Sequence, residues 1–441
     1  MRLMATPPNI VFLISDDHRS DALGAAGNAS VHTPVMDALA AQGTLLTHAC
    51  NMGAMHGAVC MPSRAMIMTS RTLFHLQEGG RVIPPGDVTF PELLRGNGYR
   101  THAVGKWHSD EASHLRCFET GSSLFFGGMF QNQWQPAVCQ RTPAGSGHTP
   151  PVTVDRHATE LFADSAVNFL KEYRDDKPFM LYVAFTSPHD PRTPPKEYLD
   201  RYPPEKIPLP PNFLPEHPFD NGEVRGRDEE LAPFPRTPKI VQRHTADYYG
   251  MVTHLDAQIG RILAALDASG RAGNTIVVYT ADHGLAVGRH GLFGKQNLYD
   301  HSIRVPMILR GPFIPRGKRI DSFCYLLDLY PTFCELLGID APGTVEGKSL
   351  VPLFDGNREA LRETMFFAYK SNIRSVRDVR MKLLEYTVKG AHTTQLFDTI
   401  ADPYETRNLA ADKQYADILA QLRTELARWQ GAVDDPMHSG K

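Results

Sequence analysis

The sequence predicts an α/β protein. Three apolar runs and one further strand pattern recur along the chain, helical patterns separate them, and a polar residue lies within two residues after each of them. Continuous apolar runs are typical of strands that are buried on both faces of a sheet. Alternation of such strands with helices favours an α/β architecture, in which ligands bind beyond the carboxyl ends of the strands. The predicted strands cover residues 9–15, 99–104, 179–185 and 275–280.

Helix signals separate these strands. Thr33 and Thr89 suit N-cap positions, and each is followed by a proline in the first turn of a helical pattern. Residues 238–269 carry the longest apolar stripe of the chain, which we interpret as core packing. The predicted helices cover residues 33–40, 62–68, 89–94, 157–173, 238–269 and 325–337, and a further strand covers residues 306–310.

Two long segments lack such periodicity. Residues 121–151 are rich in Gly, Gln, Pro and Ser and predict a long irregular loop, whereas residues 194–237 predict a Pro-dense excursion packed on the domain. Beyond residue 359, short alternating runs predict a small antiparallel sheet, covered by an amphipathic helix at residues 411–429. We therefore divide the chain into a main domain, residues 1–358, and a C-terminal subdomain, residues 359–441.

Composition argues against several classes of protein. The net charge of −3 and the isoelectric point near 6.7 disfavour a general nucleic-acid binder, which carries a basic excess. Six cysteines without a CxxC pair disfavour both a disulfide scaffold and a zinc ribbon. No run is long enough to span a membrane, and residues 1–8 lack the apolar core of a signal peptide. We expect a soluble, cytoplasmic protein without nucleic-acid or membrane partners, unless an export signal has been trimmed away.

Residues 60–64, Cys-Met-Pro-Ser-Arg, are the stretch around which we expect the site to be organised. Pro62 suits the first position of a helix, so Cys60 would lie at or just before a helix N-terminus. Free backbone N–H groups and the helix dipole favour an anion there. Arg64 follows about one turn later on the same side. The simpler alternative is that Cys60 is a small hydrophobic residue of the core.

Further candidate residues follow the other strands. Asp16 and Asp17 come after the first strand and Asp282 after the last, and their oxygens suit a hard divalent cation. Lys106 and His108 lie two residues apart, so in extended chain they would face the same side. Taken alone, the Asp16-Asp17 pair would more often be a solvated polar turn, whereas the spacing of Lys106 and His108 favours a shared site somewhat more than solvated surface.

The stretch from Cys60 to Arg64 resembles the signature of the type I sulfatases, in which the cysteine is oxidised after synthesis to formylglycine. Other segments resemble the family in the same order along the chain, at residues 105–108, 188–189, 294–306 and 396–409. The resemblance implies an alkaline-phosphatase-like fold, with a mixed, largely parallel sheet between helices and a smaller C-terminal α+β subdomain. Residues 1–358 would then form the catalytic domain, and a formylglycine-generating enzyme would act on the chain.

The resemblance also implies roles for individual residues. One cation, Ca²⁺, would be bound by Asp16, Asp17, the modified Cys60, Asp282 and His283. Many members carry Asn at the position of His283, so Mg²⁺ and Mn²⁺ are alternatives. His189 would protonate the leaving oxygen, and His108 would deprotonate the remaining hydroxyl so that the aldehyde re-forms. The implied catalytic residues are Cys60, Arg64, Lys106, His108, His189 and Lys295, of which Arg64 and the two lysines would neutralise the sulfate oxygens.

The expected substrate is a sulfate ester on a sugar or oligosaccharide. Residues 125–129 and 187–192 resemble segments of bacterial sulfatases that act on sulfated polysaccharides. Alternatives are an aryl or choline sulfatase, a phosphonate or phosphate monoester hydrolase, and a non-catalytic binder of sulfated glycans whose Cys60 stays a thiol. The candidate sugar contacts are His18, His56, Trp134 and Arg192.

Overall fold

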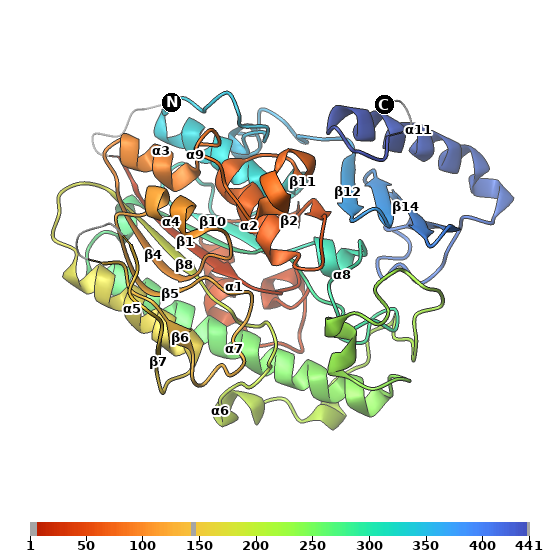
Figure 1. Cartoon of the computed structure of the whole chain (residues 1–441), viewed down its shortest axis with the longest axis horizontal. Coiled ribbons are helices and arrows are strands. Elements are labelled where there is room, and N and C mark those ends of the chain that lie inside the picture. The colour runs from red at the N-terminus through yellow and green to blue at the C-terminus, as the bar shows by residue number, and fades with distance from the viewer. Residues whose placement is uncertain (1–6, 143–146, 439–441) are drawn as a thin grey trace.

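An eight-stranded sheet forms the centre of the molecule (Figure 1). The structure is a computed structural model that describes residues 7–142 and 147–438. The strand order is β11-β2-β10-β9-β1-β8-β4-β5, and every pair is parallel except the two that involve β10, so the sheet is mixed and largely parallel as predicted. Its strands are β1 (Asn9–Ser15), β2 (Thr44–Cys50), β4 (Arg100–Lys106), β5 (Thr120–Phe125), β8 (Phe179–Ala184), β9 (Thr275–Ala281), β10 (Met307–Arg310) and β11 (Lys318–Tyr325).

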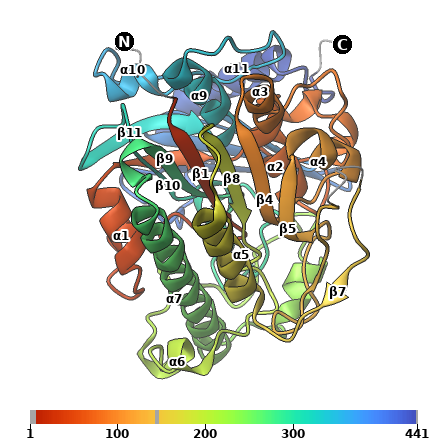
Figure 2. The same ribbon diagram turned by 90° about the vertical axis from the view of Figure 1, so that its left-hand side faces the viewer.

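Helices cover both faces of this sheet (Figure 2). Strand β1 is buried throughout, and its side chains alternate between two cores. Val11 and Leu13 pack in the core that holds residues of α1, α5 and α7, whereas Ile10 and Phe12 pack in the core that holds residues of α2, α3 and α9. The longer helices are α1 (Pro34–Ala41), α2 (Cys60–Thr69), α3 (Phe90–Gly96), α4 (Glu111–Cys117), α5 (Ala158–Glu172), α7 (Pro238–Ala268) and α9 (Leu329–Leu337). The shorter ones are α6 (Lys196–Leu199), α8 (Asp300–Ile303) and α10 (Val351–Phe354).

A second sheet follows near the C-terminus, with the order β15-β14-β13-β12-β3 (Figure 1). Four of its strands form the predicted antiparallel sheet, and the terminal helix α11 (Ala416–Ala432) packs on it. The fifth strand, β3 (Gly53–Ala54), comes from the first part of the chain and pairs parallel with β12. The small sheet therefore draws on both parts of the chain, and the proposed boundary after residue 358 stays a prediction. The four C-terminal strands are β12 (Met365–Tyr369), β13 (Ile373–Arg377), β14 (Met381–Val388) and β15 (Ala391–Asp398).

The expectation of an irregular loop over residues 121–151 is wrong in its first part. Strand β5 occupies Thr120–Phe125 and pairs in parallel with β4 at the edge of the large sheet. Two further short strands, β6 (Ala137–Val138) and β7 (Val152–Thr153), pair with each other. The Gly- and Ser-rich sequence of β5 has no apolar pattern that would predict a strand. The segment is extended because it pairs with β4. In the described part of the chain, no helix combines the length and the apolar character that crossing a membrane requires.

One edge of the large sheet collects the predicted site segments. Strands β9, β1, β8 and β4 are neighbours and run parallel, so their carboxyl ends lie together. Helix α2 begins at the same edge, because Ser63 Oγ donates to the carbonyl oxygen of Asp282 at 2.6 Å and Arg64 Nη1 donates to that of Lys106 at 3.2 Å. The topology thus brings segments that are far apart in sequence to one place.

A buried ionic network ties the second sheet to the segment that follows the site. The ammonium group of Lys382 on β14 lies 2.8 Å from Asp300 Oδ1 at the start of α8 and 2.6 Å from Glu405 Oε1. Arg377 on β13 adds a bond of 3.0 Å to Asp300 Oδ1. The Lys382 side chain is completely buried. Removing one member of such a network leaves uncompensated charge in a medium of low polarity.

We therefore expect Lys382→Met to destabilise the protein by about 3–5 kcal/mol, because Asp300 and Glu405 would stay buried without the ammonium group. Urea denaturation followed by tryptophan fluorescence measures this loss. The matched control is Lys389→Met, which removes an exposed ammonium group paired with Asp220 and should leave stability nearly unchanged. Equal effects of the two substitutions would contradict the assignment of a stabilising network.

Candidate active site

Three carboxylates lie at the ends of β1 and β9. Asp16 and Asp17 follow β1 directly, Asp282 follows β9, and none of the three is exposed. Asp17 has a left-handed backbone with φ of 67°, and its N–H donates to Asp282 Oδ1 at 3.3 Å. Asp tolerates this conformation better than most residues. The Asp282 carboxylate therefore links the end of β9 to the backbone at the end of β1.

Helix α2 delivers Cys60 to these carboxylates. The helix begins at Cys60 itself, two residues before the predicted start at Pro62, and Cys60 is buried. One turn later, the Arg64 guanidinium donates from Nε to Asp282 Oδ2 at 2.8 Å. This ion pair is buried on both sides and orients the helix start towards the carboxylates.

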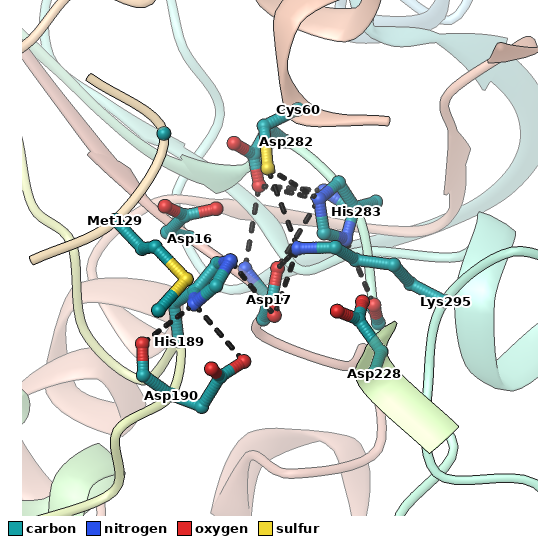
Figure 3. A network of polar contacts seen from close by, with 12 residues as sticks. Asp16, Asp17, Cys60, Met129, His189, Asp190, Asp228, Asp282, His283 and Lys295 are labelled. Atoms are coloured by element: carbon teal, nitrogen blue, oxygen red, sulfur yellow. Dashed lines mark hydrogen bonds and ion pairs between the residues drawn. The ribbon is translucent and has the colours of Figure 1, made fainter. Parts of the chain in front are cut away.

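Two side-chain nitrogen atoms lie close to the sulfur atom of Cys60 (Figure 3). His283 Nε2 lies 3.1 Å and Lys295 Nζ lies 3.4 Å from Cys60 Sγ. Burial opposes ionisation of this thiol, but Lys106, Lys295 and His283 lower its pKa well below the usual value for cysteine. The position of Cys60 therefore favours negative charge and disfavours the alternative that it is only a small residue of the core.

Two lysines complete the pairing of the carboxylates. Lys106 Nζ lies 2.6 Å from Asp16 Oδ2, and Lys295 Nζ lies 2.8 Å from Asp17 Oδ1. Lys106 is aimed there by Gly105, whose φ of +88° coincides with a register shift between β4 and β5. A Cβ at Gly105 would lie 2.0 Å from the carbonyl oxygen of Ala184, so only glycine fits.

The residues present fit a divalent cation. Asp16 Oδ1 is buried and has no hydrogen-bond partner. Two groups in the described part of the chain have ligand atoms that all lie within 4.8 Å of one another, and both contain Asp16 and Cys60. Carboxylate-rich donor sets suit hard divalent cations. The first group adds Asp17 and His189, and the second adds Asp282 and His283.

Two histidines near the cluster have pKa values shifted in opposite directions. Burial opposes the charge of His189, but Asp17, with its carboxylate oxygen 3.9 Å from His189 Nε2, raises the pKa of that ring to about 9. Burial and the neighbouring Lys106 lower the pKa of His108 to about 4. His189 is therefore suited to hold a proton at neutral pH, and His108 is suited to accept one.

The four candidate sugar contacts have different surroundings. His18 is completely buried, with its ring nitrogens 2.5 Å from the Tyr279 hydroxyl and 2.8 Å from the Ala22 carbonyl oxygen, so the structure contradicts its expected contact with substrate. His56 Nε2 bonds the carbonyl oxygen of Gly79 at 3.1 Å. Trp134 is 41% exposed. Arg192 is half-buried, and its Nε and Nη2 atoms have no partner, which leaves donors for a ligand.

The sequence did not point to a second set of polar residues next to His189. Asp190 follows His189 and accepts hydrogen bonds from Arg227, which also bonds Asp228. Asp228 in turn accepts from Gln296, the neighbour of Lys295. Arg227 and Asp228 lie in the Pro-dense segment, where no motif or periodicity distinguishes them, so no local signal was available.

Two family models match the chain. The model described as Sulfatase matches residues 8–339, and the model described as N-sulphoglucosamine sulphohydrolase, C-terminal, matches residues 288–432. The first spans β1 to α9 and therefore all four strand ends at the site. The second spans the small antiparallel sheet.

Curated relatives and solved structures agree with these matches. The chain is 30% identical to the ulvan-active sulfatase of Formosa agariphila, over 98% of this chain and 83% of the relative. It is 25% identical to the N-acetylglucosamine-6-O-sulfatase of Bacteroides thetaiotaomicron, over 97% of this chain and 87% of the relative.

Two solved structures share the fold. One, solved in complex with its substrate D-glucosamine-2-N,6-O-disulfate, has a TM-score of 0.81 at 23% identity and covers 99% of this chain and 100% of that chain. The phosphonate monoester hydrolase of Agrobacterium radiobacter has a TM-score of 0.77 at 23% identity, with 97% and 96% covered. Together they confirm the alkaline-phosphatase-like arrangement of a largely parallel sheet between helices.

We expect a divalent cation to stabilise the folded protein, because the buried carboxylates bind it only when the chain is folded. Adding Ca²⁺, Mg²⁺ or Mn²⁺ to chelator-treated protein should raise the midpoint of thermal unfolding, by an amount equivalent to about 2.7 kcal/mol at a hundredfold excess over Kd. Asp16→Asn should reduce this rise, whereas the exposed control Asp176→Asn should retain it. If none of the three cations changes the midpoint of thermal unfolding of the parent protein, the assignment of a cation site is contradicted.

Proposed function

The chain belongs to the sulfatase family and is a sulfuric ester hydrolase, and from this premise we propose that it removes sulfate from a sulfated sugar or oligosaccharide. The names of its relatives support a sugar sulfate as the substrate. One relative acts on ulvan, another on N-acetylglucosamine 6-O-sulfate, and a structural neighbour was solved with a disulfated glucosamine as its substrate. A phosphonate monoester hydrolase shares the fold as well, so the class of ester has to be tested directly.

The surroundings of Cys60 carry the catalytic part of the proposal. Its sulfur marks where a formylglycine would present its oxygen atoms, next to Lys295 and His283 and at the N-terminus of α2. A formylglycine made from Cys60 would supply the nucleophilic oxygen that a thiol lacks. This maturation requires a formylglycine-generating enzyme as a partner of the chain.

Asp16, Asp17, Asp282 and His283 would hold the cation together with the modified Cys60. We propose Ca²⁺, because three of these side chains offer carboxylate oxygens. When bound, the cation supplies positive charge for the sulfate oxygens and for the nucleophile. Each carboxylate already has a cationic neighbour, so a bound divalent cation would leave the site with an excess of positive charge, which favours an anionic ester.

Three side chains of fixed positive charge would bind the sulfate group. Lys106 pairs with Asp16 and Lys295 with Asp17, and Arg64 has a buried Nη2 group without a partner. Donors that are held in place before the substrate arrives stabilise the charge of the transferring group without reorganisation. These residues would bind and orient the sulfate ester.

His189 and His108 would handle the protons. His189 would hold a proton at Nε2, which lies 3.9 Å from Asp17 Oδ2, and would give it to the departing sugar oxygen. His108 is largely buried, and its Nδ1 atom has no partner, so this ring is available to accept a proton when sulfate leaves. Arg192 and Trp134 remain our candidates for sugar contacts, since one has free donors and the other an exposed ring.

The test is sulfate release by protein produced together with a formylglycine-generating enzyme. The panel holds sulfated glycosaminoglycan di- and oligosaccharides, nitrophenyl sulfate, choline sulfate and a phenyl phosphonate ester. We expect turnover to be strongest on one position of a sugar. Release only from the aryl, choline or phosphonate compounds would contradict the proposed substrate.

Cys60→Ala should lower sulfate release by more than about a thousandfold, because it removes the precursor of the nucleophile. The matched control Cys139→Ala changes a half-buried cysteine outside the cluster and should keep parental activity. The mass of the Cys60 peptide reports the modification independently. An unmodified peptide from fully active protein would overturn the formylglycine part of the proposal.

A further inference from the structure

The turn that begins at Arg227 connects the Pro-dense segment to the site. It is a short 3₁₀ helix, Arg227–Leu231, and it contacts two loops that carry proposed catalytic residues. We propose that Arg227 is a positioning residue, which fixes the orientation of His189 through the carboxylate of Asp190. The inference rests on the proposed function, in which His189 gives its proton to the leaving sugar oxygen.

The His189 ring is oriented from its Nδ1 side. Nδ1 lies 2.8 Å from the carbonyl oxygen of Asp190 and 3.2 Å from Asp190 Oδ1 (Figure 3). Both partners are acceptors, so Nδ1 carries a hydrogen and Nε2 faces the carboxylate cluster. A histidine that works at one nitrogen is aligned by the hydrogen bond that the other nitrogen makes.

Arg227 holds the carboxylate that makes this contact. Its Nη1 and Nη2 atoms lie 2.8 Å and 2.6 Å from Asp190 Oδ2, the oxygen that does not face the ring. Asp190 is only 4% exposed, so without Arg227 its carboxylate would lose its two charge-assisted hydrogen bonds in a nearly water-free place. Arg227 therefore fixes the rotamer of Asp190, and Asp190 fixes the ring.

Two of the three remaining N–H donors of Arg227 also meet protein atoms. Nε donates to Asp228 Oδ1 at 2.8 Å, and Nη1 lies 2.8 Å from the Met129 sulfur. An arginine that binds substrate would keep a free pair of donors, as Arg192 does. The contacts of Arg227 thus favour a positioning role over a role in sugar binding.

The same turn fixes the loop of Lys295. Asp228 Oδ2 accepts from Gln296 Nε2 at 2.8 Å, and the Glu229 carboxylate accepts the backbone N–H groups of Phe293 and Gly294 at 2.8 Å each. These bonds bracket Lys295 on both sides. The hydrogen bonds of Asp228 and Glu229 hold the turn in place, and the turn holds Arg227 next to Asp190.

Esters with a poor and with a good leaving group distinguish a positioning role of Arg227 from a merely structural one. A sugar alkoxide is a poor leaving group and needs a proton in the transition state, whereas nitrophenolate leaves without one. Loss of a well-placed proton donor therefore slows the sugar ester and spares the nitrophenyl ester. A general loss of structure would slow both.

We would measure kcat and KM of matured, Ca²⁺-loaded protein on a sulfated disaccharide and on nitrophenyl sulfate. Arg227→Ala should lower kcat on the sugar by about tenfold to a hundredfold and kcat on the nitrophenyl ester by less than about threefold. Arg227→Lys retains the charge but not the paired donors. Its kcat on the sugar should therefore lie between that of the parent protein and that of Arg227→Ala. The matched control is Arg225→Ala, two residues earlier, where the guanidinium packs 4.4 Å from the Phe234 ring, and it should change neither rate by more than about twofold.

A double variant tests whether Arg227 acts through His189. If it does, His189→Ala combined with Arg227→Ala should be no slower on the sugar than His189→Ala alone. Additive losses would overturn the inference, as would an equal loss on both esters. A raised KM with unchanged kcat would also overturn it, because Arg227 would then bind the substrate.

A crystal structure of Arg227→Ala gives a readout that does not depend on activity. We expect the Asp190 carboxylate to turn away and the His189 ring to leave its present orientation. An unchanged ring would overturn the positioning role even in a fully active enzyme. Absence of sulfate release by the parent protein from every ester would instead overturn the proposed function, and the crystal structure would still decide the role of Arg227.

Discussion

Three carboxylates buried at one edge of a sheet are the constraint on which the rest of the site depends. Charges in such a place are tolerated only when opposite charges meet them. Asp282 is met by Arg64, Asp16 by Lys106 and Asp17 by Lys295, all at 2.6–2.8 Å. The same pairing places cationic side chains around the carboxylate cluster. This arrangement suits a divalent cation and an anionic ester at the same time.

The parallel sheet satisfies this constraint with short local segments. Neighbouring parallel strands end at one edge, so residues that directly follow β1, β4, β8 and β9 converge there without long loops. Helix α2 adds Cys60 from the side and is held by Arg64 and Ser63. The chemistry of the site is therefore a consequence of where the strands end.

The Pro-dense segment from residue 194 to residue 237 gives the site its outer support. It has little regular structure, yet its turn at Arg227–Leu231 bonds both the segment after His189 and the loop of Lys295. A segment of this kind is held by side-chain contacts and not by a ladder of backbone bonds. Its sequence pattern therefore says little about its importance.

The sequence alone determined the four buried strands, the capped helix after Thr89 and the acidic and basic residues at the strand ends, because apolar runs and caps are local signals. The resemblance of residues 60–64 to a family signature led from there to a proposed site, and the match to the sulfatase family confirmed the family.

Only the tertiary structure decided features that depend on partners distant in sequence. Strand β5 is extended because β4 pairs with it, although its Gly- and Ser-rich sequence predicts a loop. His18 directly follows Asp17, which has a left-handed backbone conformation. The His18 ring nevertheless lies in the core, where it is hydrogen-bonded to the Tyr279 hydroxyl. Arg227 meets Asp190 across 37 residues of chain. Strand pairs and ion pairs between residues that are far apart in sequence form only when the chain folds. No periodic pattern in the sequence contains both partners, so the sequence does not predict them.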